Sequence, residues 1–309
     1  MTDSVKELEN RITSVVRGKD RVVRQALACV FAEGHLLIED VPGVGKTILA
    51  LSLAKTLGLS LQRIQFTADL LPTDILGVSV FNPRDQSFEF KPGPIFHNVV
   101  LADEINRSSP KTQSALLEAM SERQVTTDQT TRPLPHPFFV IATQNPHEHH
   151  GTFPLPESQK DRFLMRVTMG YPDPAHELEI LRNGIDAQAA ERLAPVADAV
   201  LMRKGIESVR AVRVDPALDE YVLALVRETR ESPFLELGAS PRGALALRRS
   251  AQANAFLEGR DYVLADDIKS LAVAVLAHRV VPRGSDGEPE SEAARRVVEE
   301  LLARVPVPL

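Results

Sequence analysis

The stretch Glu39–Thr47, which reads Glu-Asp-Val-Pro-Gly-Val-Gly-Lys-Thr, combines the residue types that bind a chain of phosphates. Gly43 and Gly45 let successive backbone N–H groups turn toward an anion, because no side chain obstructs its approach. Lys46 supplies a positive charge for the β- and γ-phosphates, and the hydroxyl group of Thr47 supplies a ligand for Mg²⁺. The sequence therefore predicts a nucleotide site, whose binding residues in this loop are Pro42, Gly43, Val44, Gly45, Lys46, Thr47 and Ile48.

A second group of polar residues ends the apolar run that begins near Val99. Asp103 stands at the tip of this run, where a carboxylate can hold Mg²⁺ together with Thr47. Glu104 follows directly and can orient and deprotonate the water that attacks the γ-phosphate. We therefore expect Asp103 to be a metal ligand and Glu104 to be the catalytic base.

Two further residues gain meaning from this pairing. Asn145 follows the apolar stretch 138–144, and its amide can hydrogen-bond both the γ-phosphate and the attacking water. Arg242 follows Ser240, which is a capping residue at a helix start, and can reach a phosphate from there. By themselves, an Asn in a turn and an Arg at a helix end are ordinary solvated residues.

The elements that must position these residues have two different patterns. Short apolar runs at 36–38, 61–66, 99–102 and 138–142 lack polar alternation, which is typical of parallel strands covered on both faces. After residue 171 the pattern is almost purely helical, with helices expected at 174 onward (capped by Asp173), 216–230, 240–259, 265–279 and 292–303 and a polar linker at 283–290. The sequence predicts an α/β fold: a phosphate-loop αβα core with a parallel sheet over residues 1–171, followed by a smaller all-helical lid over residues 172–309.

The amino-terminal residues predict two helices ahead of the first strand. Val5, Leu8, Ile12 and Val15 recur at helical spacing. A second helix is expected from 20 to 33, with Gly34 as its carboxyl-terminal cap.

Composition excludes several classes of protein. The 309 residues are enough for two domains, and 43% hydrophobic and 25% charged residues are those of an ordinary globular protein. The net charge of −6 and the absence of Trp argue against a sequence-independent nucleic-acid binder. No apolar run approaches the ~18 residues of a membrane span and the amino terminus is not a signal peptide, so we expect a cytoplasmic protein. The lone Cys29 lies in an apolar helical run and is expected to be a small core residue rather than a reactive thiol.

Taken together, the motifs resemble those of the MoxR-type AAA+ ATPases, which belong to the helix-2-insert group of AAA+ proteins. Asp40 stands where the usual phosphate loop begins with glycine, and an Asp at this position fits the group. The matching motifs, which span most of the chain, are Gly43–Thr47, Leu101–Arg107, Ala142–Pro146, Gly151–Phe163 and Gly238–Arg242.

The resemblance implies ATP or ADP as ligand, Mg²⁺ as cofactor, and a homo-oligomeric ring, usually a hexamer. It implies that Asn145 is the sensor 1 residue, that Arg242 is sensor 2, and that Gly18 lies near the adenine. Arg162 would be the arginine finger that reaches a neighbour's γ-phosphate, with Arg107 and Arg166 as reserve candidates for that role.

The resemblance also implies two insertions, at 74–95 and at 122–137, the second being a hairpin. Such insertions often face the ring pore or a partner, although the residues alone favour simple packing equally. The run His147–His150 lacks the His-Glu-x-x-His spacing of a helical metal site, so a solvated loop is the expected reading.

The leading functional hypothesis is a chaperone-like ATPase that remodels, assembles or activates a partner protein, in this family often one with a von Willebrand A domain. The main alternative is the ATPase subunit of a metal-insertion machine of the chelatase type. A nucleic-acid motor is disfavoured by the acidity of the chain, a phosphotransferase by the water-activating position of Glu104, and a binding-only regulator by the intact catalytic residues.

Overall fold

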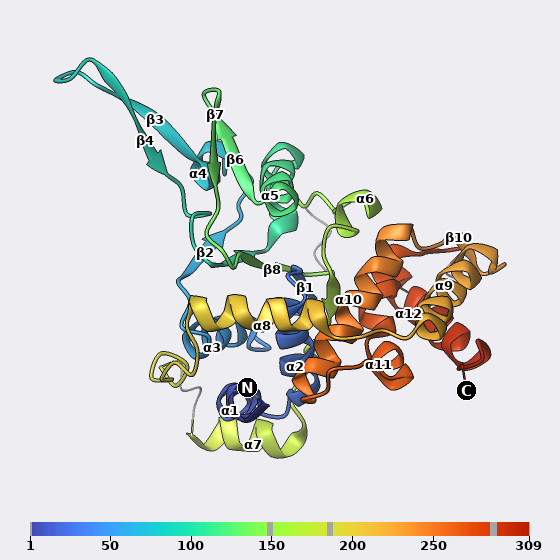
Figure 1. The fold of residues 1–309 in the computed structure, drawn as a ribbon. Helices are drawn as coiled ribbons and strands as arrows, with labels where there is room; N and C mark the ends of the chain where they lie inside the picture. Colours follow the sequence, from blue (N-terminus) through green and yellow to red (C-terminus); the bar gives the residue numbers. More distant parts are fainter. Residues whose placement is uncertain (1, 147–150, 184–187, 285–288, 309) are drawn as a thin grey trace.

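The computed structural model describes residues 2–146, 151–183, 188–284 and 289–308. At its centre lies a five-stranded sheet with the spatial order β2-β5-β8-β1-β9 (Figure 1). Its strands are β1 (Leu36–Glu39), β2 (Leu61–Gln65), β5 (Val99–Asp103), β8 (Phe139–Gln144) and β9 (Met165–Val167). Neighbouring strands are parallel, with Glu39 opposite Gln144 and Gln65 opposite Asp103. Their carboxyl ends therefore meet along one edge, and the predicted α/β fold is confirmed.

Both faces of this sheet are buried. Leu36 and Ile38 point into one hydrophobic cluster and Leu37 into the other, because successive side chains of a strand point to opposite faces. The first cluster includes residues of α1 (Thr2–Thr13), α2 (Asp20–Phe31) and α3 (Lys46–Thr56) and extends into helices later in the chain. The helices of the second are α4 (Pro72–Leu76), η1 (Ile105–Arg107) and α5 (Pro110–Glu122). Double coverage explains why the strands read as unbroken apolar runs.

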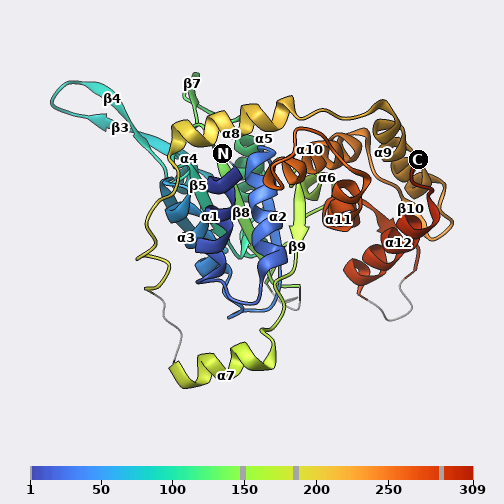
Figure 2. The same cartoon turned by 60° about the horizontal axis from the view of Figure 1, so that its bottom comes forward.

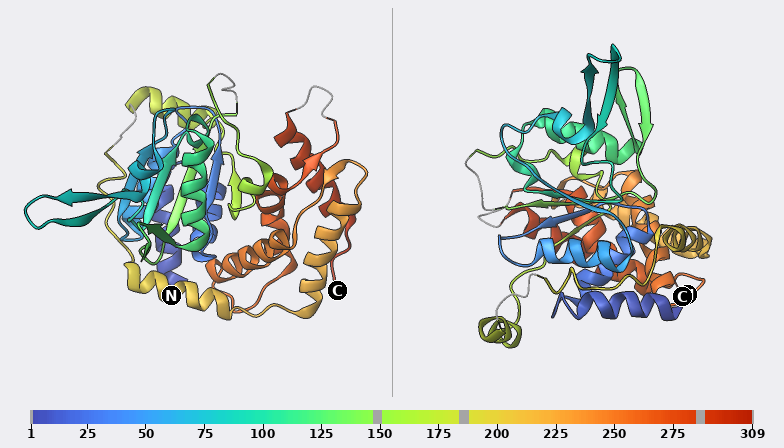
Figure 3. Two further views of the ribbon diagram at one scale, coloured as in Figure 1. Left: turned by 90° about the horizontal axis from the view of Figure 1, so that it is seen from above. Right: turned by 90° about the vertical axis from the view of Figure 1, so that its left-hand side faces the viewer.

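The carboxyl-terminal helices pack together beside β9, as the left-hand view of Figure 3 shows. They are α9 (Pro216–Glu231), α10 (Pro241–Leu257), α11 (Ala265–Leu276), η2 (Ala277–Arg279) and α12 (Glu290–Arg304). A two-stranded antiparallel ribbon, β10 (Leu235–Leu237) with β11 (Val281–Pro282), joins them. The pattern of the sequence did not predict this ribbon, because its strands are too short to show a period of two.

Three further helices come before these carboxyl-terminal helices in the sequence, the first between β8 and β9 and the other two after β9. They are α6 (Glu157–Lys160), α7 (Pro174–Asn183) and α8 (Ala199–Ala211). Asp173 caps α7 as predicted, since its carboxylate accepts a hydrogen bond from the His176 backbone N–H at 3.0 Å. Figure 2 shows α7 standing apart below α1, whereas α8 packs against both α2 and α10. One hydrophobic cluster runs from Val5 to Val305 through both parts of the chain, and the division after residue 171 stays a prediction.

Both predicted insertions form antiparallel hairpins that project from the sheet (Figures 1 and 3). One pairs β3 (Gly77–Asn82) with β4 (Ser87–Pro92), and the other pairs β6 (Gln124–Thr127) with β7 (Thr130–Pro133). They support each other: Ser79 donates a hydrogen bond to Asp128, and the guanidinium of Arg132 lies 3.8 Å from the centre of the Phe90 ring.

The end of α2 corrects one prediction. The left-handed residue that ends this helix is Glu33, with φ 55°, and not Gly34. Gly34 donates its N–H to the Cys29 carbonyl at 2.9 Å, as in a Schellman turn. A Cβ atom on Gly34 would lie 2.3 Å from atoms of Leu164, so glycine is required there for close packing.

The amino-terminal helices differ from one expectation, on the end of the first helix, and agree with another, on Cys29. The opening helix ends at Thr13, and the residue that is buried beyond it is Val16 and not the predicted Val15. Cys29 is fully buried and burial raises the pKa of its thiol, which confirms a small core residue. Within the described ranges, no helix has the length and apolar character needed to cross a membrane.

Candidate active site

The predicted phosphate loop connects the carboxyl end of β1 to the first turn of α3. Gly43 and Gly45 adopt φ values of 84° and 96°, which side chains of L-residues rarely permit. Gly45 is the N-cap of α3 and carries no side chain that could satisfy the first N–H groups of the helix. A Cβ on Gly43 would meet no atom within 4 Å, so the loop is open on that side. These backbone groups and the positive end of α3 fit a triphosphate.

The unusual Asp40 anchors this loop. Its carboxylate is buried and accepts hydrogen bonds from the backbone N–H of Val41 at 2.8 Å and from that of Gly170 at 2.6 Å. Its carbonyl oxygen accepts a hydrogen bond from Nζ of Lys46 at 2.8 Å. An Asp in place of the usual glycine therefore ties the loop to the chain that leaves β9, a role that the sequence did not indicate.

Asp103 lies at the carboxyl end of β5 and is held by a neighbouring strand. Oγ1 of Thr143 on β8 donates to Oδ1 of Asp103 at 2.6 Å and accepts the backbone N–H of Glu104 at 2.9 Å. This hydroxyl group fixes both acidic residues at once. Sequence reasoning missed Thr143, whose position two residues before Asn145 gains meaning only once β8 is known to lie beside β5.

Asp103 also has a cationic partner, Arg63 on β2. Nη2 and Nε of Arg63 donate to Oδ2 of Asp103 at 2.6 and 3.2 Å. The side chain of Asp103 is 13% exposed and that of Arg63 is 52% exposed. A positive charge therefore lies beside Asp103, one of the two predicted Mg²⁺ ligands. The second predicted ligand, Thr47, is exposed on the first turn of α3.

Glu104 has the backbone geometry of a strained functional residue. Its φ of 57° and ψ of 49° place a non-glycine residue in the left-handed region. Its Oε2 accepts a hydrogen bond from Nε2 of Gln65 at 2.8 Å and lies 3.2 Å from Nε of Arg107. Arg107, a reserve candidate for the finger, therefore lies against the Glu104 of its own chain.

The structure brings Asn145 to the same edge. It follows β8 directly and is buried, and the backbone N–H of Asp40 donates to the carbonyl oxygen of the preceding Gln144 at 3.1 Å.

Gly18 has φ 67°, and a Cβ there would lie 3.0 Å from Nδ1 of His176 at the start of α7. The proximity of Gly18 to an adenine base stays a prediction.

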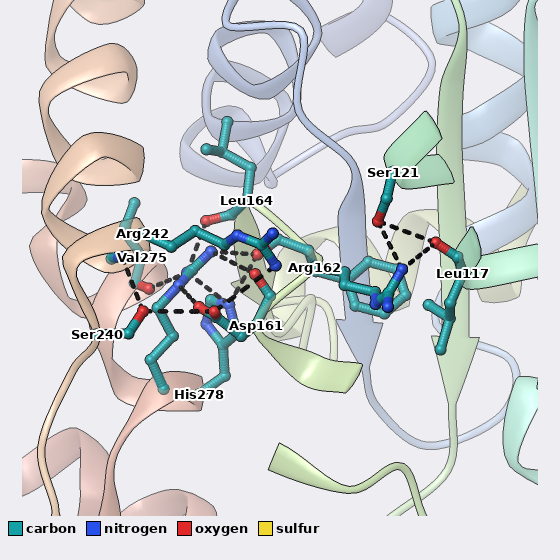
Figure 4. Close-up of polar contacts among 12 residues, drawn as sticks. Leu117, Ser121, Asp161, Arg162, Leu164, Ser240, Arg242, Val275 and His278 are labelled. Atoms are coloured by element: carbon teal, nitrogen blue, oxygen red, sulfur yellow. Dashed lines mark hydrogen bonds and ion pairs between the residues drawn. The ribbon is translucent and has the colours of Figure 1, made fainter. Parts of the chain in front are cut away.

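The predicted arginines lie elsewhere (Figure 4). Nη1 of Arg162 donates to the Leu117 carbonyl at 2.9 Å and to Oγ of Ser121 at 2.7 Å, both on α5. Arg242, at the start of α10, lies with Nη1 3.9 Å from Oδ2 of Asp161.

The other reserve candidate, Arg166, is mostly buried on β9. Its Nη1 pairs with Oε2 of Glu39 at 3.0 Å, directly before the phosphate loop. The role of Arg162 as a finger stays a prediction.

The run His147–His150 lies outside the described residues. In the part of the chain that the structure does describe, no group of three or more His, Cys, Asp or Glu side chains is arranged to hold a metal ion.

Comparisons with known proteins agree with this geometry. Residues 35–165 match the family described as "ATPase family associated with various cellular activities (AAA)", and residues 227–301 match the AAA lid domain. The chain is 48% identical to the uncharacterized protein YeaC of Bacillus subtilis, over 96% of this chain and 93% of YeaC. It is 40% identical to the chaperone MoxR1 of Mycobacterium tuberculosis, over 90% of this chain and 76% of MoxR1. A crystal structure of a candidate ATPase from Cytophaga hutchinsonii superposes with a TM-score of 0.90 at 39% identity, covering 100% of this chain and 96% of the other.

Proposed function

The chain belongs to the MoxR-type AAA+ ATPases, enzymes that hydrolyse ATP, and from this premise we propose that it is a ring-forming, chaperone-like motor that acts on a partner protein. Lys46 and the loop N–H groups would bind the triphosphate, while Thr47 and Asp103 would hold Mg²⁺. The metal supplies neutralising charge at the β- and γ-phosphates when it is bound. Glu104 takes the proton of the attacking water, which Asn145 orients.

The arginines complete this reaction. Arg242 contacts the γ-phosphate of its own subunit, and Arg162 reaches the nucleotide of the neighbouring subunit in a ring that we propose to be hexameric. In related phosphoryl-transfer enzymes a finger of this kind raises the rate about 10³- to 10⁵-fold. Arg162 makes its side-chain hydrogen bonds with neutral groups of α5, whereas Arg107 and Arg166 pair with acids of their own subunit's site, and this difference supports Arg162 as the residue that acts in trans.

Mixing two inactive variants tests the ring. Arg162→Ala should bind ATP but hydrolyse it poorly, and Lys46→Ala should not bind ATP. Combined, they should recover part of the activity, because the second variant lends its Arg162 to a neighbour that binds ATP. Arg248→Ala is the matched control, since Arg248 pairs with Asp219 and Gln252, away from the nucleotide site, and should stay active alone. Mixed rings with no recovery would show that Arg162 does not act in trans.

The observation that carries a protein partner is the exposed apolar surface of the β3–β4 hairpin. Phe81 and Phe88 face each other across the hairpin with ring centres 5.3 Å apart, and Phe88 is 73% exposed. Val78 and Val80 are also exposed. Exposed apolar side chains grouped on a projecting hairpin are typical of a protein contact. The name of the relative chaperone MoxR1 also supports a protein partner. We propose that this chain acts in the cytoplasm.

A hairpin variant tests this partner, for which we propose a protein with a von Willebrand A domain, encoded by a neighbouring gene. Phe81→Ser combined with Phe88→Ser should keep basal ATP hydrolysis and lose its stimulation by the purified partner. Leu223→Ser, which changes an exposed apolar residue of α9, is the matched control and should keep the stimulation. Unchanged stimulation in the hairpin variant would refute the role of this surface.

A further inference from the structure

A buried arginine of the lid holds the segment that carries Arg162. The side chain of Arg279, at the end of η2, is only 2% exposed. Its Nε donates to Oδ1 of Asp161 at 2.8 Å, and its Nη2 donates to the carbonyl oxygens of Phe163 at 2.5 Å and Asp161 at 3.3 Å. Its Nη1 donates to the Leu164 carbonyl at 3.1 Å. One lid side chain therefore fixes the backbone on both sides of Arg162.

The charge of Arg279 requires Asp161. Burial lowers the pKa of Arg279, and the attraction of the Asp161 carboxylate opposes this shift. Nε2 of His278 lies 2.7 Å from Nη1 of Arg279, and burial together with the charge of Arg279 holds the pKa of His278 well below its usual value. His278 therefore stays neutral, and Asp161 is the carboxylate that balances this buried cation.

The second oxygen of Asp161 faces a different part of the lid (Figure 4). Oγ of Ser240, the N-cap of α10, donates to Oδ2 at 3.4 Å, and Nη1 of Arg242 lies 3.9 Å from the same atom. The side chain of Arg242 is 60% exposed, so it can leave this contact at little cost. Asp161 is thus shared between the buried Arg279 and the exposed Arg242.

Arg162 itself is docked on its own subunit. Its guanidinium donates hydrogen bonds to the Leu117 carbonyl and to Ser121, both on α5. A side chain docked in this way must be released before it can serve a neighbouring site. Asp161 is adjacent in sequence to Arg162, so a small movement of the Asp161 backbone changes the direction in which Arg162 points.

We propose that Asp161 is a positioning residue that couples Arg242 to Arg162, so that nucleotide in one subunit's site releases the finger for the next site. This inference rests on the proposed function, in which Arg242 contacts the γ-phosphate. When Arg242 turns to that phosphate, it leaves Asp161, whose carboxylate then moves fully to Arg279. The resulting shift of residues 161–164 draws Arg162 away from α5.

Mixed rings with two kinds of finger donor measure this coupling. The acceptor in both cases is Arg162→Ala, which binds ATP but lacks a finger. One donor is Lys46→Ala, whose own site stays empty, and the other is Glu104→Gln, whose site holds ATP without turnover. Neither donor contributes hydrolysis of its own, so the recovered rate reports the finger alone. We expect the ATP-filled donor to restore at least about five-fold more activity than the empty one, the lower end of typical allosteric coupling.

Asp161→Asn, introduced into both donors, should abolish this difference and leave the two recovered rates equal. Asp267→Asn is the matched control: Asp267 is also a carboxylate paired with an arginine, Arg260 at 2.7 Å, but it lies within the lid, away from residues 161–164. Donors with Asp267→Asn should keep the difference. A merely structural role of Asp161 would lower both recovered rates together and preserve their ratio, which would overturn the proposal.

The outcomes separate the coupling from the underlying mechanism. If neither donor restores activity, the trans role of Arg162 is wrong and the coupling falls with it. If both donors restore activity equally without the Asp161 change, the coupling alone is wrong. Should the Asp161→Asn donors fail to fold, Arg242→Gln takes their place, because Arg242 is exposed; a donor difference that survives Arg242→Gln at saturating ATP would also overturn the proposal.

Discussion

Arg63 is expected to compete with Mg²⁺ for Asp103. Its guanidinium makes two hydrogen bonds with the same carboxylate oxygen, Oδ2, while Thr143 occupies the other. A metal ion that uses Asp103 must therefore displace Arg63 or share the carboxylate with it. Because Arg63 is about half exposed, we take the pair at the upper end for surface ion pairs, about 1 kcal/mol. Removing it should lower the Mg²⁺ concentration for half-maximal activity by about five-fold.

The assay is a Mg²⁺ titration of ATP hydrolysis at saturating ATP for the wild-type protein and Arg63→Gln. The difference should shrink at high ionic strength, since salt screens a half-exposed pair. Arg213→Gln is the matched control, because it breaks an exposed ion pair with Asp261 far along the chain and should leave the titration unchanged. If Arg63→Gln instead required more Mg²⁺, Arg63 would be helping to bind the nucleotide and the competition argument would be wrong.

Three further predictions concern binding, stability and partners. Lys46→Ala should lose binding of a fluorescent ATP analogue, whereas Glu104→Gln should bind it normally and hydrolyse ATP about 10²- to 10⁴-fold more slowly; wild-type turnover in both would contradict the assigned roles. Burial, assisted by the positive charge of Arg123, lowers the pKa of His35 from 6.5 to about 4, although the hydrogen bond with the Met120 carbonyl acts in the opposite direction. The unfolded chain therefore binds a proton that the folded chain refuses, and the free energy of unfolding should fall by about 3 kcal/mol between pH 6.5 and 4. Urea unfolding across this range should show a weaker fall for His35→Gln, and an equal fall would point to other groups. Duplex DNA should not stimulate hydrolysis at physiological salt, given the net charge of −6; stimulation that drops steeply with added salt would instead indicate phosphate contacts.

The sequence predicted those features that depend on local chemistry. The strands at Leu36 and Val99, the phosphate loop and the helix start at Ser240 all follow from apolar runs, glycines and capping residues. Contacts between distant residues could not be predicted in this way. Nothing near Gly34 announces that Leu164 will pack against it, and the prediction of a cap failed for that reason.

The same limit applies to the polar residues of the site. Arg63 and Thr143 meet Asp103 because β2 and β8 flank β5, and the order of strands in a sheet is not written in any one strand. Arg279 would read as a solvated charge at a helix end, the commoner role of arginine. Only the packing of η2 against residues 161–164 shows that it is buried.

The phosphate loop has two structural ties that lead toward the lid, and both explain why its sequence departs from a plain glycine-rich turn. Asp40 accepts the backbone N–H of Gly170, where the chain leaves the sheet with φ 65° toward α7. Glu39, one residue earlier, pairs with Arg166, whose Nη2 donates to the Ser291 carbonyl at the start of α12 at 3.3 Å. A glycine at position 40 would keep the cradle but lose the first tie. The acidic pair Glu39–Asp40 therefore connects this loop to Gly170, where the chain leaves the sheet, and through Arg166 to the start of α12.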